Sequence, residues 1–337
     1  MTLERLVDRT PVVAPEALIE GLVPPPLFSA VRFDTYRPNP GEPTQAAAVT
    51  ALEEFAARIN TPSGRGGLFR KKSDPQPRGV YLDGGFGVGK THLLASLWHA
   101  AEGPKAYATF VELTHLAGAL GFAQVVQALA PMRLLAIDEF ELDDPGDTVL
   151  VSTLLAHLSE RGIALAATSN TLPDRLGEER FATADFMREI QGLAAHFTSV
   201  RVDGPDYRHR GLPSAPLPRS DVDVREAVLA RPGATLDDFD ELIHHLGRLH
   251  PSRYGALVDG VPAVGLIGLR QAPDQAVALR LVVLIDRLYD RQIPVIASGV
   301  PVDKLFDAHM LAGGYRKKYR RAVSRLVALT VSAPERD

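Results

Sequence analysis

The chain contains a run of glycines, one lysine and one threonine whose spacing suits phosphate binding. It reads Gly84-Gly85-Phe86-Gly87-Val88-Gly89-Lys90-Thr91, which has the form G-x-x-x-x-G-K-T. Such glycines let backbone N–H groups turn inward around phosphate oxygens. Lys90 would reach the β- and γ-phosphates of a nucleotide, and Thr91 would offer its hydroxyl to Mg²⁺. The run predicts a nucleotide site, and the alternative for the run taken alone is a glycine-rich turn.

Two adjacent carboxylates follow an apolar run further along the chain. Asp138 and Glu139 come directly after residues 134–137, which read as a buried strand. In ATPases with such a loop, the first acid holds Mg²⁺ through water, because Mg²⁺ keeps most of its hydration shell. The second acid can accept the proton of the attacking water. Glu141 is the alternative base, and a plain strand ending in a solvated acidic turn is the alternative for the pair.

A polar pair, Ser169-Asn170, ends the next apolar run at 163–168. An amide at a strand end can hydrogen-bond the attacking water or the γ-phosphate, which makes Asn170 a candidate sensor. Asparagine is also common in ordinary turns. The sequence therefore predicts a second polar side chain at the same edge of a sheet, with a turn residue as the alternative.

Three arginines follow that are candidates for phosphate contact. Arg180 and Arg188 would each suit an arginine finger that faces the nucleotide of a neighbouring subunit and offsets charge in the transition state. A trans-acting arginine implies a homo-oligomer that forms with ATP. A surface arginine is the alternative for both, and Arg208 in Asp206-Tyr207-Arg208 would face the phosphates or pair with an acid.

Apolar runs alternate with helical patterns through the middle of the chain. The predicted strands are 79–83, 107–111, 133–138, 163–168 and 199–203. A helix over 44–59, with Thr44 as its N-cap, precedes them. This alternation predicts a parallel α/β sheet with both faces covered.

Proline-rich stretches suggest the domain boundaries. The expected division is an N-terminal arm at 1–44, an ATPase core at 45–212, a linker at 213–222, and a smaller C-terminal α/β domain at 223–337. Within the last of these we expect a helix over 222–248, short strands over 256–269, a helix over 273–290, a strand over 293–297, and a basic helix over 316–329.

Composition narrows the class of protein. The chain has 337 residues, 45% of them apolar, a net charge of −4 and no cysteine. Disulfides, thiolate metal sites and cysteine nucleophiles are excluded. The apolar runs are shorter than the roughly 20 residues that span a bilayer. The N-terminus also lacks the apolar core of a signal peptide. We expect a soluble, cytoplasmic protein without a membrane span.

The motifs together resemble the ZapE-type cell-division ATPases, which are AAA+-like proteins with mitochondrial relatives. The order of the phosphate loop, the acid pair, Thr168-Ser169-Asn170 and Arg180-Phe181 carries the resemblance, and so do segments at both ends of the chain. These end segments are Tyr36-Arg37-Pro38 with Gln45-Ala46, residues 283–290 (Val-Leu-Ile-Asp-Arg-Leu-Tyr-Asp), and Ser324-Arg325-Leu326. The resemblance covers nearly the whole chain. It departs at Val88 and at Ala182-Thr183, where the family has a proline after the phenylalanine.

The resemblance implies an AAA+-type P-loop NTPase core that uses ATP and Mg²⁺ and acts on a protein client, of which FtsZ is the family's bacterial example. Gln45 would contact the adenine edge, or would be a surface residue at a helix start. The expected nucleotide-binding residues are Gln45, Gly84, Gly85, Phe86, Gly87, Val88, Gly89, Lys90, Thr91 and His92. The expected metal-binding residues are Thr91 and Asp138.

Two other classes share parts of this pattern. A nucleic-acid-associated ATPase of the helicase-loader type would have a similar core, but such loaders usually end near the Asp206-Tyr207-Arg208 position. A small-metabolite kinase would carry a lid of arginines soon after the core strands, and Glu139 in the base position favours water as the acceptor. Nucleic acid is therefore the less expected partner.

Overall fold

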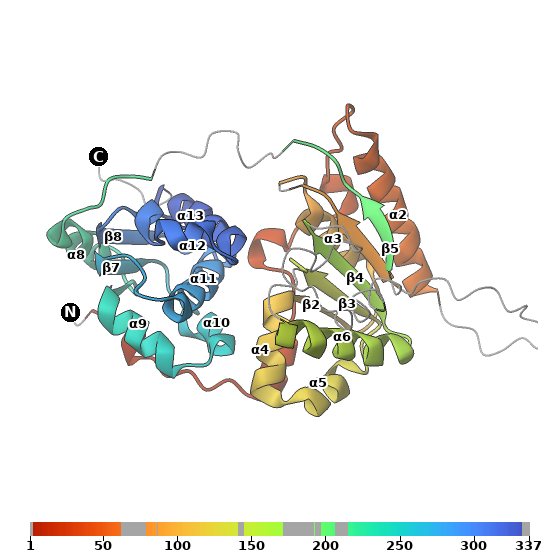
Figure 1. Ribbon diagram of the computed structural model, residues 1–337, viewed down its shortest axis with the longest axis horizontal. Helices are drawn as coiled ribbons and strands as arrows, with labels where there is room; N and C mark the ends of the chain where they lie inside the picture. The colour runs from red at the N-terminus through yellow and green to blue at the C-terminus, as the bar shows by residue number, and fades with distance from the viewer. Residues whose placement is uncertain are drawn as a thin grey trace, which may run out of the picture. The chain divides into compact units, whose positions relative to one another are not determined.

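The computed structural model describes residues 3–61, 79–85, 87–140, 145–170, 192, 197–205 and 215–331. The chain forms two compact units (Figure 1). The central unit comprises Pro15–Pro24 and Phe28–Arg210, and the terminal unit comprises Met1–Ala14, Pro25–Leu27 and Gly211–Asp337. Within the described residues, no helix is both long and apolar enough to cross a membrane.

A five-stranded parallel sheet forms the middle layer of the central unit, with the strand order β2-β3-β4-β1-β5. Its strands are β1 (Gly79–Asp83), β2 (Lys105–Thr109), β3 (Leu134–Asp138), β4 (Ala164–Ser169) and β5 (Phe197–Arg201). All five predicted strands are present, with shifts of one or two residues at their ends. Because the strands are parallel, their carboxyl ends lie along one edge of the sheet.

Alternate residues of the strands pack on opposite faces of this sheet. Val80 and Leu82 face one helical layer, whereas Tyr81 faces the other. The first layer consists of α2 (Pro43–Asn60) and α3 (Lys90–Ala100), and the second of α4 (Phe110–Leu120), α5 (Phe122–Leu129) and α6 (Pro145–Glu160). Burial on both faces explains why the strands read as apolar runs in the sequence. The unit also contains α1 (Pro15–Glu20) and the 3₁₀ turn η3 (Phe33–Thr35).

The start of α2 differs from the prediction. Its N-cap is Glu42 and its first residue is Pro43, so the assignment of Thr44 as N-cap was wrong. Proline suits the first helical position because its fixed φ is helical and its missing N–H would have no partner there. Thr44 instead accepts a hydrogen bond from the backbone N–H of Asp203, at 2.9 Å. The side chain thus ties the helix to the segment after β5.

The terminal unit contains a smaller parallel sheet with the order β6-β7-β8. Its strands are β6 (Thr235–Asp238), β7 (Val264–Leu269) and β8 (Val295–Gly299). Its helices are α8 (Asp221–Leu229), α9 (Phe239–Arg248), α10 (Tyr254–Leu257), α11 (Gln275–Asp290), α12 (Ala308–Ala312) and α13 (Arg316–Val331), with 3₁₀ turns η1 (Leu6–Asp8), η6 (Pro251–Arg253) and η7 (Val302–Lys304). The expected α/β class, with a parallel-sheet core and a smaller C-terminal α/β domain, is confirmed.

The prediction of one helix over 222–248 was wrong, because β6 separates α8 from α9. The break comes at Pro232-Gly233, where Gly233 has a φ of 82°. Proline and glycine together favour a turn over a continuing helix. Asp238 then caps α9, since its carboxylate accepts the N–H groups of Asp240 and Glu241. Asp237 and Asp238, which fall inside the predicted helix, therefore end the strand β6, and Asp238 also caps α9.

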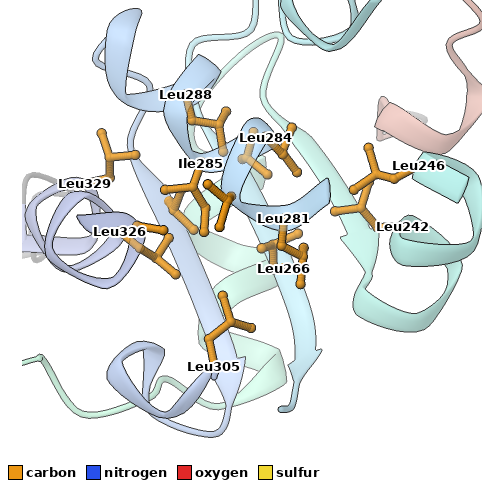
Figure 2. Close-up of a cluster of buried hydrophobic side chains, with 14 of the residues drawn as sticks. Leu242, Leu246, Leu266, Leu281, Leu284, Ile285, Leu288, Leu305, Leu326 and Leu329 are labelled. Carbon is orange, nitrogen blue, oxygen red and sulfur yellow. The ribbon is translucent and has the colours of Figure 1, made fainter. Parts of the chain in front are cut away.

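Leucines from several elements fill the core of the terminal unit (Figure 2). Those labelled in Figure 2 come from α9, β7, α11 and α13, with Leu305 at the end of η7, and Leu281, Leu284 and Leu288 lie on one face of α11. On the other face of the sheet, α8 packs Val224 and Val228 against β6 and β8. This unit therefore has its own three-layer core.

The N-terminal residues belong to this sheet rather than to a separate arm. Leu6 has no exposed surface, and the carbonyl of Glu4 accepts the N–H of Leu236 in β6, at 2.9 Å. The buried carboxylate of Asp237 accepts the N–H groups of Leu6 and Val7, both at 3.0 Å. Burial raises the pKa of Asp237, although these two hydrogen bonds oppose the shift. Residues 3–8 therefore cover one edge of the sheet.

The basic helix α13 turns part of its charge inward. Asp286 of α11 accepts hydrogen bonds from Arg321 at 3.0 Å and Arg325 at 2.5 Å, and all three side chains are mostly buried. Burial alone would raise the pKa of Asp286, but the guanidinium groups of Arg325 and Arg321 outweigh it and lower that pKa. Arg320, one residue from Arg321, is exposed. The helix is therefore not uniformly a solvated basic face.

Candidate active site

The glycine-rich run lies between β1 and α3, as a phosphate-binding loop requires. Gly89 caps α3 with a left-handed φ of 90°, and Gly87 has a φ of 71°. A Cβ on Gly89 would lie 2.6 Å from the ring of Tyr36, so a side chain at this position would clash. A Cβ on Gly85 would meet nothing within 4 Å, which shows open space above the loop. The loop leads directly into the N-terminus of α3, where an anion is favoured.

Lys90 is held at the loop by three oxygens. Its Nζ donates to the carbonyls of Gly84 at 2.8 Å and Gly85 at 2.5 Å, and to Oδ1 of Asn170 at 3.0 Å. An ammonium has three N–H donors. A phosphate that binds Lys90 must therefore replace one of these acceptors. The contact with Asn170 brings together two residues that the sequence predicted for the site.

Asp138 is the last residue of β3 and is 6% exposed. Its Oδ1 accepts from the hydroxyls of Thr168 and, at 3.3 Å, Thr91, and its Oδ2 accepts from the hydroxyl of Tyr107 at 3.1 Å. Burial and the nearby carboxylate of Glu139 raise the pKa of Asp138, while the hydrogen bonds lower it. Thr91 and Asp138, the predicted metal-binding residues, thus lie in contact.

These side chains suit Mg²⁺, which prefers oxygen ligands and keeps several waters. The hydroxyl of Thr91 and the carboxylate of Asp138 supply such oxygens beside the phosphate loop. Mg²⁺ held by these two residues would neutralise the negative charge of a bound phosphate. The residues present therefore fit the metal that the motif implies.

Glu139 leaves the strand in an unusual backbone conformation, with a φ of 53°. Few residues other than glycine adopt this left-handed region, and such outliers collect at functional sites. Its N–H donates to the hydroxyl of Thr168 at 3.0 Å, and the next N–H, of Phe140, donates to the carbonyl of Thr168 at 2.7 Å. The predicted base is thus held at the carboxyl edge of the sheet by the neighbouring strand.

Gln45 is buried, with 1% exposure. Its Oε1 accepts the N–H of Asn39 at 2.8 Å, and its Nε2 donates to the carbonyl of Asp203 at 2.8 Å. Both ends of the amide are thus bonded to the backbone, and the side chain is not at the surface. Its contact with adenine stays a prediction.

The segment before α2 packs against the phosphate loop. The hydroxyl of Tyr36 donates to the carbonyl of Val88 at 2.9 Å, and its ring meets that of His92 edge-on, with centroids 5.5 Å apart. His92 Nε2 also lies 2.9 Å from the hydroxyl of Thr35. His92 therefore faces the segment before α2, and the carbonyl of Val88 accepts a hydrogen bond from that segment.

Several predicted residues lie outside the described part of the chain. They are Phe86, Glu141, Arg180, Arg188 and Arg208. Their roles in phosphate binding, proton transfer and the trans contact stay predictions.

Sequence reasoning assigned no role to two residues that contact Asp138. Thr168 was named only as the first residue of the Thr168-Ser169-Asn170 motif. Tyr107 lies inside an apolar strand, and nothing in its sequence context indicates a functional role. Thr168 directly precedes Ser169-Asn170 at the strand end, so parallel pairing with β3 would have pointed to it. Tyr107 pairs in register with Ala136, two residues before Asp138 and on the same face. Burial, together with the adjacent Asp138, raises the pKa of Tyr107 well above its usual value.

Comparison with known proteins gives a family match over almost the whole chain. A family model described as AFG1-like ATPase matches residues 12–224 and 215–334. Cell division protein ZapE of Escherichia coli strain K12 is 26% identical over 313 residues, which cover 77% of this chain and 81% of that protein. Lactation elevated protein 1 homolog B of Danio rerio is 24% identical over 301 residues, covering 70% of this chain and 58% of that protein.

Solved structures give looser matches. DnaI is 16% identical with a TM-score of 0.41, and the match covers 56% of this chain and 97% of that one. AMPPCP-bound DnaA from Aquifex aeolicus is 11% identical with a TM-score of 0.39, covering 60% of this chain and 56% of that one.

Proposed function

Because the chain belongs to the AFG1-like ATPase family, we propose that it couples ATP hydrolysis to work on a protein partner of the cell-division machinery. The family membership and the ZapE relatives confirm the resemblance drawn from the motifs, and they make the chain an ATP hydrolase. The division role rests on the name of those relatives. The observation that carries the site assignment is the convergence of Lys90, Thr91, Asp138 and Asn170 at one edge of the sheet.

The chemistry we propose is transfer of the γ-phosphoryl group to water. Lys90 binds the β- and γ-phosphates, and Thr91 and Asp138 hold Mg²⁺. Glu139 accepts a proton as the water oxygen bonds to the γ-phosphorus and the bond to the ADP oxygen breaks. Asn170, which contacts Lys90 at 3.0 Å, would orient the water or the γ-phosphate. The backbone N–H groups of the loop surround the phosphates.

We also propose that ATP favours self-association, with Arg180 supplied to the neighbouring site and Arg188 as the alternative. An arginine in trans is worth roughly 10³–10⁵ in rate where it operates. Turnover per chain should then rise with protein concentration. A monomer in ATP by sedimentation, with a rate independent of concentration, would contradict this assembly.

The terminal unit is our candidate for contact with the client, of which an FtsZ-type division protein is the proposed example. The phosphate-directed residues that are described lie in the central unit. Arg320 is exposed on α13 and would suit an acidic partner segment. A cytoplasmic location would be consistent with such a client.

The test is ATPase activity of the purified full chain with Mg²⁺, alone and with candidate division proteins. Lys90→Ala should lower turnover by roughly 10²-fold or more, because it removes a charge aimed at the phosphates. Lys304→Ala is the matched control, since this lysine is exposed on the terminal unit. Undiminished hydrolysis in Lys90→Ala would refute the site. Stimulation by DNA with a steep salt dependence, in place of stimulation by a division protein, would refute the proposed client.

A further inference from the structure

We propose that Thr168 is a positioning residue that sets both acids of the active site at once. The inference rests on the proposed hydrolysis and adds to it a residue outside the phosphate loop and the acid pair. The hydroxyl of Thr168 donates to Oδ1 of Asp138 and accepts the N–H of Glu139 at 3.0 Å. One side chain thus bonds to the residue proposed for the metal and to the backbone of the proposed base.

The pairing of two strands places Thr168 there. β4 lies beside β3 in the sheet, and their register aligns Ala167 with Ile137. One residue further on, Thr168 therefore lies opposite Asp138. Thr168 is 2% exposed, so water does not substitute for either hydrogen bond. A hydroxyl has one proton and two lone pairs, and here the proton serves Asp138 while a lone pair serves Glu139.

Thr168 also restrains the backbone turn at Glu139, which sets the direction of the Glu139 side chain. Glu139 has a left-handed φ of 53°, which a glutamate adopts only where its surroundings enforce it. Thr168 supplies two of those restraints, because its hydroxyl bonds the N–H of Glu139 and its carbonyl bonds the N–H of Phe140. Threonine is also stiff about χ1, so its hydroxyl has a fixed direction. Loss of the hydroxyl should therefore misplace Glu139 as well as Asp138.

Tyr107 offers a matched control in the same network. Its hydroxyl bonds Oδ2 of Asp138 at 3.1 Å, and it is 3% exposed. No hydrogen bond described in the structure joins it to the backbone of Glu139. Tyr107→Phe therefore removes one bond to Asp138 alone, whereas Thr168→Val removes a bond to each acid at nearly constant volume.

The experiment compares Thr168→Val, Thr168→Ser and Tyr107→Phe with the wild-type chain. Thr168→Val should lower single-turnover hydrolysis roughly tenfold or more, the scale of one well-placed hydrogen bond. Thr168→Ser keeps the hydroxyl and should recover most of the rate. Tyr107→Phe should weaken metal affinity, and at saturating Mg²⁺ it should lower the rate less than Thr168→Val does, because its lost hydrogen bond reaches Asp138 alone.

Two readouts separate positioning from general destabilisation. The first is Mn²⁺ affinity by electron paramagnetic resonance, with a non-hydrolysable ATP analogue bound, which Thr168→Val and Tyr107→Phe should both weaken. The second is a double-mutant cycle with Glu139→Gln. If Thr168 acts through Glu139, the Val substitution should cost little further rate in that background.

A wild-type rate in Thr168→Val would overturn the inference, and so would full additivity with Glu139→Gln. If Thr168→Val does not fold, Thr168→Ala makes the same comparison without a new methyl group. Failure of the proposed function is distinct, because it would show as undiminished hydrolysis in Lys90→Ala. Loss of rate in Lys90→Ala with a wild-type rate in Thr168→Val would refute this inference alone.

Discussion

At the scale of single residues, Glu139 combines a proposed catalytic role with an unusual backbone conformation. Glu139 has a left-handed φ of 53° and is the next residue after the buried Asp138. The two adjacent carboxylates thereby differ in setting, one at the end of a strand and the other on the turn that follows. This difference suits a metal-holding acid and a proton acceptor as separate roles.

Glu139→Gln should keep ATP binding and lower hydrolysis by about 10²–10⁴-fold. The amide preserves size and hydrogen bonding but cannot accept the proton of the attacking water. Single-turnover hydrolysis and binding of a fluorescent ATP analogue measure the two effects. Glu53→Gln, an exposed residue of α2, is the control. If Glu141→Gln shows this loss of hydrolysis and Glu139→Gln shows little, then Glu141 is the base.

At the scale of elements, the pairing of α11 with α13 depends on one carboxylate. Asp286 holds Arg321 and Arg325, and Arg325 also lies over the ring of Tyr289 at 5.2 Å. These arginines belong to the basic helix that the sequence predicted over 316–329. Reversal of Arg321 would therefore test the fold of the unit, whereas Arg320 is the better probe of a partner.

Asp286→Asn should destabilise the terminal unit by about 3–5 kcal/mol, because it leaves two mostly buried guanidinium groups without their counter-charge. Asp259→Asn, at an exposed carboxyl, is the control. The pKa of Asp286 is lowered in the fold, so its contribution is complete above the unfolded value of about 3.9 and is lost as pH falls below it. Urea unfolding at several pH values should show the difference from wild type shrinking only in acid. A constant difference at every pH would contradict the charge argument.

At the scale of the whole molecule, residues 3–14 belong to the same compact unit as residues 215–331, although most of the central unit lies between them in the sequence. Leu6 is fully buried among residues of the terminal unit, and the backbone of Glu4 pairs with β6. Residues near position 5 therefore complete a fold most of whose residues lie beyond position 210. The segment around Leu6 must therefore be present for this unit to bury its core.

Leu6→Ala should lower the stability of the terminal unit by about 2–5 kcal/mol, the cost of a cavity at a buried leucine. Hydrogen exchange at the amides of β6 should rise, while ATP affinity stays unchanged. Val12→Ala is the control in the same segment, since Val12 is 87% exposed. Unchanged exchange in Leu6→Ala would mean that the N-terminal residues do not support the sheet.

Much of the fold and of the site could be predicted because the signals are local. The glycines of the phosphate loop, Lys90 at the helix start and Asp138 at the strand end lie in short segments, where a backbone conformation or a strand end dictates the residue type. The five core strands read as apolar runs because both faces of the sheet are covered. The strand β6 could not be recognised this way, because it has only four residues and the last two, Asp237 and Asp238, are acidic.

The sequence by itself determined the nucleotide chemistry, since that chemistry depends on residue types at fixed local spacing. Only the tertiary structure decided which side chains support it. Tyr107 and Thr168 reach Asp138 from two other strands, and Leu6 contacts Asp237 of β6 across more than two hundred residues of sequence. Such contacts depend on strand order and register, which are set by packing of the whole chain rather than by any one segment.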